Sequence, residues 1–217
     1  MIPLCNFLSA LVLRNGDVLT HPMLDSHSDL VQHFKLPDTR AHHQHFAKVE
    51  LTPVEDWLDV SMWVFRLDEN TVPGWWVDVS SQAEATLRGR AERMILKTGD
   101  HSLLIDGCWI IGGDAVVRDV RAGRVRRVCG GTISNVSGGT ISDVWGGTIS
   151  NVWGGTISDV RGGTISDVRG GTISNVRGGT ISDVWGGTIS NVWGLPWTPL
   201  LDDSAKAHVA SLRKDEK

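Results

Sequence analysis

The chain has 217 residues, of which 41% are apolar, enough to build a core in one or two domains. A formal charge of −4 and a pI near 6 give no general attraction to nucleic acid or to an anionic membrane surface. Three cysteines, Cys5, Cys108 and Cys129, without CxxC spacing, exclude a dense disulfide framework and predict a reducing, cytoplasmic location.

The first 16 residues, MIPLCNFLSALVLRNG, are apolar but lack the basic segment and the small-residue cleavage site of a secretory signal. No apolar run reaches the ~20 residues of a membrane-spanning helix, so no membrane association is expected. Residues 7–13, Asn15-Gly16 and residues 18–19 instead predict a β-hairpin with a type I′ turn, because Asn-Gly tolerates positive φ angles.

The rest of the N-terminal region predicts mixed elements. We expect a short helix at 26–34, strands at 46–51 and 63–67, and a helix from about 82 to 97. That longer helix has a capping-box start at Ser81 and Glu84 and a stop at Gly99. Residues 103–105 and 108–111 predict a second hairpin. Residues 1–105 are therefore predicted to form a small α+β domain.

From Gly130 to Trp193 the chain consists of eight near-copies of the octapeptide GGTISxVx. The segments 114–121 (DAVVRDVR) and 122–129 (AGRVRRVC) keep the apolar fourth position and the valine at position seven. So short a period indicates a β-solenoid, and two glycines in every eight residues exclude a helix. The predicted fold is mainly β: a solenoid over 106–194, capped by the N-terminal domain and by residues 195–217.

Two octapeptides per coil is the smallest arrangement that can enclose a core, although three or four remain possible. With two, the Ile and Val side chains point inward, and position eight forms two outward columns. One column contains Trp145, Arg161, Arg177 and Trp193, and the other contains Ser137, Trp153, Arg169 and Trp185.

The variable eighth position is the predicted binding surface, because exposed Trp and Arg are typical of binding hot spots. Its candidate residues are Trp145, Trp153, Arg161, Arg169, Arg177, Trp185 and Trp193. The alternative is that these side chains only stack on one another and stabilise the array. The Asn/Asp alternation at position six is attributed more to duplication than to chemistry, although it also limits like-charge stacking in some coil geometries. Residues 138–153 and 178–193 are identical, which indicates a duplicated block.

The segments FLSALVLRNGDVL with DSHSDL, FAKVELTP, LDENTVPGWW and GCWIIGG precede the octapeptides. In these segments the chain resembles an uncharacterised family of bacteriophage and bacterial proteins that joins a small N-terminal domain to a variable repeat array. The resemblance implies a phage-encoded protein in the host cytoplasm. It implies no activity, cofactor or catalytic residue.

The sequence favours a non-enzymatic interaction protein whose solenoid binds a host or defence protein. Nucleic-acid binding or mimicry is the first alternative, because five arginines between 118 and 127 form a basic segment at the beginning of the array. Aspartates along the rest of the array nearly balance these charges. Ice or surface binding through Thr-Ile-Ser is the second. End-to-end or edge association of copies is left open.

Catalytic and metal sites are weaker hypotheses. Cys5 could act as a nucleophile with His21, His27 and Asp25, yet no spacing defines such a site, so the protein is predicted not to be an enzyme. His42, His43 and His45 could present two imidazoles on one side of an extended segment. No further ligands stand near them in the sequence, so no metal and no cofactor is predicted.

Overall fold

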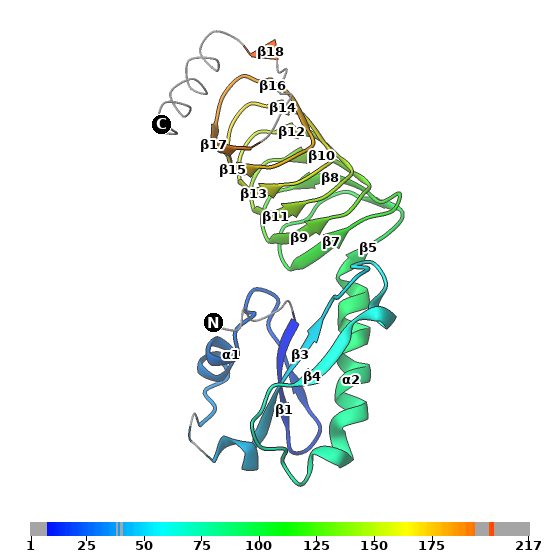
Figure 1. The fold of residues 1–217 in the computed structure, drawn as a ribbon, viewed down its shortest axis with the longest axis vertical. Helices are drawn as coiled ribbons and strands as arrows, with labels where there is room; N and C mark the ends of the chain where they lie inside the picture. Colours follow the sequence, from blue (N-terminus) through cyan, green and yellow to red (C-terminus); the bar gives the residue numbers. More distant parts are fainter. Residues whose placement is uncertain (1–7, 38, 40, 194–199, 202–217) are drawn as a thin grey trace. The chain divides into compact units, whose positions relative to one another are not determined.

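The structure is a computed structural model that describes residues 8–37, 39, 41–193 and 200–201. The chain divides into two compact units between Met94 and Ile95. The first contains a four-stranded sheet with two α-helices, and the second is a stack of parallel strands (Figure 1). The solenoid therefore begins before residue 106, where the sequence placed the domain boundary.

The sheet of the first unit is antiparallel, in the order β2-β1-β3-β4. Its strands are β1 (Leu8–Leu13), β2 (Val18–Leu19), β3 (Phe46–Thr52) and β4 (Val64–Leu67). The predicted first hairpin is confirmed. Its turn is not type I′, which needs two consecutive positive φ angles, because only Gly16 has one, at 90°.

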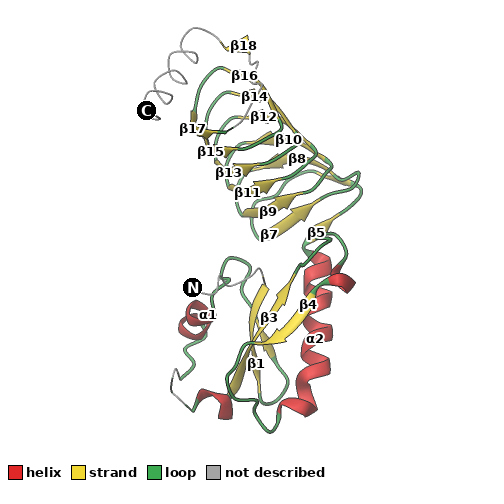
Figure 2. Ribbon diagram, in the orientation of Figure 1, coloured by secondary structure: helices red, strands yellow, loops and turns green. Residues whose placement is uncertain are grey.

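In the described part of the first unit, two α-helices and two short 3-10 helices accompany this sheet, and Figure 2 shows the helices in red. They are α1 (His27–His33), η1 (His42–Gln44), η2 (Val60–Met62) and α2 (Trp76–Arg93). Helix α1 packs on β1, and Ser26 caps it by accepting a hydrogen bond from the Asp29 N–H. Helix α2 packs on β1 and β3 and buries Val79, Ala83, Leu87 and Ala91.

The bounds predicted for the longer helix are wrong at both ends. Helix α2 begins at Trp76, so Ser81 lies inside it and forms no capping box. The start is set by tertiary contacts that a capping pattern does not reveal: the Trp76 ring stacks on Phe65 with 6.1 Å between centroids, and the Trp75 indole N–H donates to the His43 carbonyl. The helix ends at Arg93, because the next residues form the first strand of the solenoid.

The second unit contains two seven-stranded parallel sheets, in the orders β18-β16-β14-β12-β10-β8-β6 and β17-β15-β13-β11-β9-β7-β5. Successive strands alternate between the sheets, so Ile141 pairs with Ile157. One coil is therefore two octapeptides, as predicted. The strands are β5 (Ile95–Leu96), β6 (Asp100–His101), β7 (Cys108–Ile111), β8 (Val116–Val120), β9 (Arg124–Val128), β10 (Thr132–Val136), β11 (Thr140–Val144), β12 (Thr148–Val152), β13 (Thr156–Val160), β14 (Thr164–Val168), β15 (Thr172–Val176), β16 (Thr180–Val184), β17 (Thr188–Val192) and β18 (Leu200–Leu201).

The second predicted hairpin does not form. Strand β7 pairs in parallel with β5 and β9, and Leu104 makes a parallel bridge to Val120. Asp106-Gly107, which resembles a hairpin turn in sequence, is a corner of the solenoid, with Gly107 at a φ of 76°. The early strands thus belong to the same coil pattern as the exact repeats.

The solenoid core consists of isoleucine and valine side chains, and each of the two sheets contributes one ladder of Ile and one ladder of Val. The Ile of position four and the Val of position seven are fully buried through most of the stack. This confirms the prediction that Ile133, Ile141, Ile149 and their equivalents lie inside. The predicted cap at 195–217 falls on residues of which only Leu200 and Leu201 are described; their strand β18 pairs with β16.

Candidate functional site

Position eight is the first residue after each solenoid strand, and its backbone is held by the coil before it. The Trp145 N–H, for example, donates to the Val128 carbonyl at 2.8 Å. Because the preceding valine points inward, the side chain of position eight points outward. All four tryptophans of the array are exposed, by 48% at Trp145, 52% at Trp153, 61% at Trp185 and 57% at Trp193.

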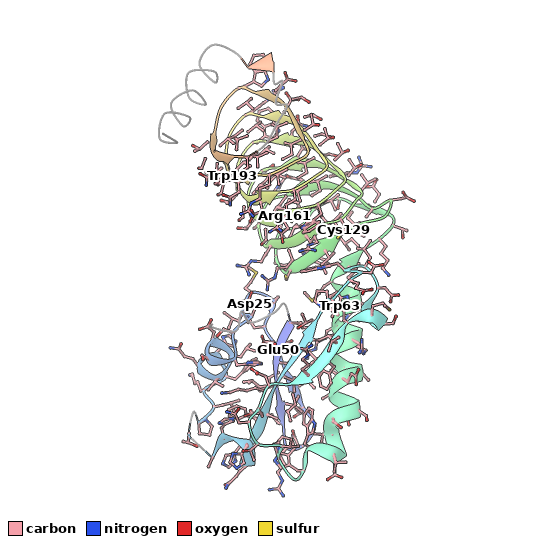
Figure 3. The ribbon with its side chains drawn as sticks, in the orientation of Figure 1. Asp25, Glu50, Trp63, Cys129, Arg161 and Trp193 are labelled. Atoms are coloured by element: carbon pink, nitrogen blue, oxygen red, sulfur yellow. The ribbon has the colours of Figure 1, made fainter. Side chains whose placement is uncertain are left out.

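Each coil has two corners, so the position-eight residues lie along two edges of the solenoid, and the predicted columns are confirmed. We call the column after β9, β11, β13, β15 and β17 the Trp145 edge and the column after β8, β10, β12, β14 and β16 the Trp153 edge. Figure 3 labels three members of the first, Cys129, Arg161 and Trp193. The Trp145 edge contains Cys129, Trp145, Arg161, Arg177 and Trp193, and the Trp153 edge contains Arg121, Ser137, Trp153, Arg169 and Trp185.

Arginines of the array stack on one tryptophan of each column. The guanidinium carbons of Arg127 and Arg161 lie 4.7 and 5.1 Å from the centre of the Trp145 ring, and that of Arg169 lies 4.7 Å from the Trp153 ring. These are cation–π contacts. Trp185 and Trp193 have no such contact with any arginine in the part of the chain that the structure describes. Among the described residues the two halves of the array therefore differ, because arginines stack on Trp145 and Trp153 but not on Trp185 or Trp193.

A recurring contact joins position eight to position six of the preceding coil. Arg161 lies 3.6 Å from the Asp143 carboxylate, Arg177 lies 3.5 Å from that of Asp159, and the Ser137 hydroxyl donates to Asp119 at 2.7 Å. Each of the two arginines of the Trp145 edge therefore lies beside a carboxylate of the preceding coil. On the other edge, Arg169 lies above Asn151 and forms no ion pair with a described residue.

Position six has a structural role that the sequence did not reveal. The Asn151 side-chain amide donates to the Ser134 carbonyl of the coil below at 3.1 Å, and Asn191 donates to the Asn175 side chain at 2.9 Å. The coil of this protein is not one of the geometries in which the Asn/Asp alternation limits like-charge stacking. With two octapeptides per coil, like residues stack in register, as Asp167 and Asp183 do.

The arginines at the beginning of the array are largely paired. Arg118 binds Asp100, Arg121 binds Asp119 at 2.7 Å, and Arg127 binds Asp143 at 3.3 Å. The hydrogen bond to Arg118 lowers the pKa of the Asp100 carboxyl. Burial lowers the pKa of Arg127, and the Asp143 carboxylate opposes that shift. Arg118 and Arg121 thus each have an aspartate beside them, whereas Arg127 shares the Asp143 carboxylate with Arg161.

The Thr and Ser of positions three and five are half-buried along most of both sheets and lie on the outward side. The polar residue of position six lies on the same faces, so the surface that was considered for ice binding also carries carboxylates.

In the first unit, the sequence-derived candidates separate. Cys5 lies outside the described residues. His42 belongs to the 3-10 helix η1 rather than to an extended segment, and its two nitrogens contact the Thr39 carbonyl at 3.0 Å and the Glu69 carboxylate at 2.9 Å. Sequence reasoning missed a different cluster, in which atoms of His27, Glu50 and Asp68 lie within 4.8 Å of one another. The three residues are far apart in sequence, and His27 was considered only as a partner of Cys5.

No α-helix in the described parts of the chain is both long and apolar enough to cross a membrane. No protein-family model, curated protein or solved structure matches the chain. The resemblance to bacteriophage and bacterial proteins therefore depends on the four segments quoted above.

Proposed function

We propose that an edge of the solenoid binds another protein. The observation that carries this proposal is the exposure of Trp185 and Trp193, at 61% and 57%, without an arginine stacked on either ring in the described chain. A side chain so exposed contributes little to the stability of the fold. Tryptophan is among the residues that contribute most when buried by a partner.

The two edges offer different spacings of the same groups. On the Trp145 edge the tryptophans are 48 residues apart (193 − 145), which is three coils or about 14 Å at ~4.8 Å per strand. On the Trp153 edge they are 32 residues apart (185 − 153), which is two coils or about 10 Å. A partner with two apolar pockets can therefore distinguish one edge from the other.

The paired arginines favour a protein partner over a nucleic acid. Ion pairs occupy Arg118, Arg121 and Arg127 at the beginning of the array, and Arg161 and Arg177 along the Trp145 edge. Phosphate binding would have to break these pairs before it gained counterion release. Following the family resemblance, we propose a host or defence protein in the bacterial cytoplasm as the partner.

The test compares two double variants that each remove two tryptophans, Trp145→Ser with Trp193→Ser and Trp153→Ser with Trp185→Ser. Proteins captured from a bacterial lysate by the wild type are identified, and their affinity for each variant is measured with purified components. We expect one double variant to lose more than ~2 kcal/mol, about 30-fold in affinity, and the other to bind nearly as the wild type does.

Leu103→Ser is the matched control, because Leu103 is a 38% exposed apolar residue of the same unit and lies on a sheet face, at the position equivalent to position six, outside both edges. Normal binding by both double variants, with a loss in the control, would refute the edges as the contact surface. Binding of DNA or RNA that both double variants retain would favour the nucleic-acid alternative.

A further inference from the structure

Among the described residues of the first unit, His27 is one of two that are polar and buried, and hydrogen bonds hold both in place. The other, Ser9, donates its hydroxyl hydrogen to the Asp25 carbonyl at 2.7 Å, which ties the segment before α1 to β1. Ser9 is also the register partner of Glu50 on β3. Figure 3 labels Asp25 and Glu50 in this part of the first unit. The cluster is thus built on paired strands and a helix start.

The hydrogen bond of His27 determines which nitrogen faces the carboxylates. Its Nε2 lies 3.0 Å from the Val49 carbonyl, and a carbonyl only accepts, so Nε2 carries the hydrogen. Nδ1 then points toward Asp68, with 3.2 Å between Nδ1 and Oδ2. In the neutral ring, Nδ1 carries a lone pair that faces the negatively charged Asp68 carboxylate. The contact is favourable only if a proton or a metal ion lies between the two atoms.

The arrangement matches that of metal-binding histidines. Such residues usually donate the second ring N–H to a backbone carbonyl or carboxylate, which orients the ring and fixes the tautomer. Two ligand atoms, each ~2.1 Å from one zinc ion, lie roughly 3.0–3.4 Å apart at angles of 90–109°. The 3.2 Å between His27 and Asp68 falls in this range, and a Glu50 oxygen lies within 4.8 Å of both.

The cluster is open to solvent on one side. His27 is buried, but 57% of the Asp68 side chain is exposed and Glu50 is half-buried. An ion can therefore enter past Asp68 and keep water in its remaining positions. One imidazole with two carboxylates suits a first-row divalent ion such as Zn²⁺ or Mn²⁺ better than Mg²⁺, which prefers oxygen ligands alone.

We propose that His27 Nδ1, Glu50 and Asp68 form a binding site for one divalent transition-metal ion. The site is independent of the solenoid edges. The competing account is that Nδ1 carries a proton and forms only an ion pair with Asp68.

The experiment titrates the full-length protein with Zn²⁺, Mn²⁺ and Mg²⁺ by calorimetry and follows the ring nitrogens of His27 by ¹⁵N NMR. We expect one equivalent of Zn²⁺ or Mn²⁺ to bind and to shift Nδ1 while Nε2 keeps its hydrogen. Asp68→Asn should weaken this binding by at least tenfold, and Glu50→Gln should also weaken it. Asp68→Asn is the decisive variant, because an exposed side chain is replaced by one of the same size.

Two control variants separate this site from adventitious binding. Asp29→Asn removes an exposed carboxylate from the same helix, and His43→Gln removes a histidine from η1; neither should change the binding. Zn²⁺ binding that Asp68→Asn leaves intact would overturn the proposal. So would an Nδ1 that stays protonated in the presence of excess metal, which would leave the ion pair as the only role of the cluster.

Discussion

The corner glycines of the solenoid provide a sharp test of the coil geometry, and Gly163 is the best example. It has a φ of +78°, in the left-handed region that side chains with a Cβ avoid. A Cβ at this position would lie 2.7 Å from the Gly147 carbonyl oxygen and 2.8 Å from the Gly146 carbonyl carbon of the coil below. Both neighbours are backbone atoms within the stack, so they cannot move aside alone.

The expected loss for Gly163→Ala combines two effects. Placing an alanine in the left-handed region costs about 1–2 kcal/mol. Separating two stacked corners adds a cost similar to overpacking a core, about 1–3 kcal/mol. The free energy of unfolding should therefore fall by about 2–5 kcal/mol. For a unit of this size the sum corresponds to a decrease in melting temperature of roughly 6–20 °C.

The assay is thermal unfolding by calorimetry, in which the transition of the solenoid is followed. Gly74→Ala is the control, because Gly74 has no positive φ and a Cβ there would meet no atom within 4 Å. It should unfold within about 0.5 kcal/mol of the wild type. If Gly163→Ala were as stable as Gly74→Ala, the left-handed corner and the two-octapeptide coil would both be refuted.

Two other predictions address the period and the charge pairs. Deleting residues 138–153 removes one whole coil and should leave a folded, soluble protein with an intact circular dichroism spectrum, because each coil contacts only its neighbours; insoluble expression of this deletion would contradict it. The folded-state pKa of Asp100 is lowered by Arg118, so its contribution to stability is present above the unfolded pKa, near ~4, and is lost as the pH falls through the folded pKa. Asp100→Asn should therefore lower the melting temperature slightly at pH 7 and not at pH 2, and an equal decrease at both pH values would show that the pair contributes nothing.

The repeat region could be predicted almost completely from its sequence because one signal repeats and nothing competes with it. Every octapeptide carries the same two inward residues and the same two glycines, so a single coil geometry satisfies all of them. Strands β5 to β7, whose sequences do not match the octapeptide, were harder to predict. Ile95 and Leu96 continue the apolar spacing of α2, and Asp106-Gly107 has the composition of a hairpin turn. Both segments take their structure from pairing with the next coil. This pairing joins residues that are distant in sequence, so local patterns do not reveal it.

The candidate sites likewise divide into features that the repeat predicts and features that depend on contacts between distant residues. The outward columns follow from the period alone, so they could be predicted residue by residue. The stacking of Arg127 on Trp145 could not, because Arg127 occupies position six of a degenerate repeat and reaches its ring only across coils. The cluster of His27, Glu50 and Asp68 depends on the register of β3 and on the end of β4. No spacing in the sequence connects these three residues.

The duplicated block explains how both edges acquired tryptophan pairs. Its copies begin at 138 and 178, and the offset of 40 residues is five octapeptides, or two and a half coils of 16 residues. The second copy therefore lies half a coil out of phase, which places Trp185 on the edge opposite its counterpart Trp145. Adding an odd number of octapeptides exchanges the edges beyond the insertion, whereas an even number preserves them. Neither change alters the Ile and Val core, so the surface of this solenoid can be rearranged by duplication without disturbing the packing that holds it together.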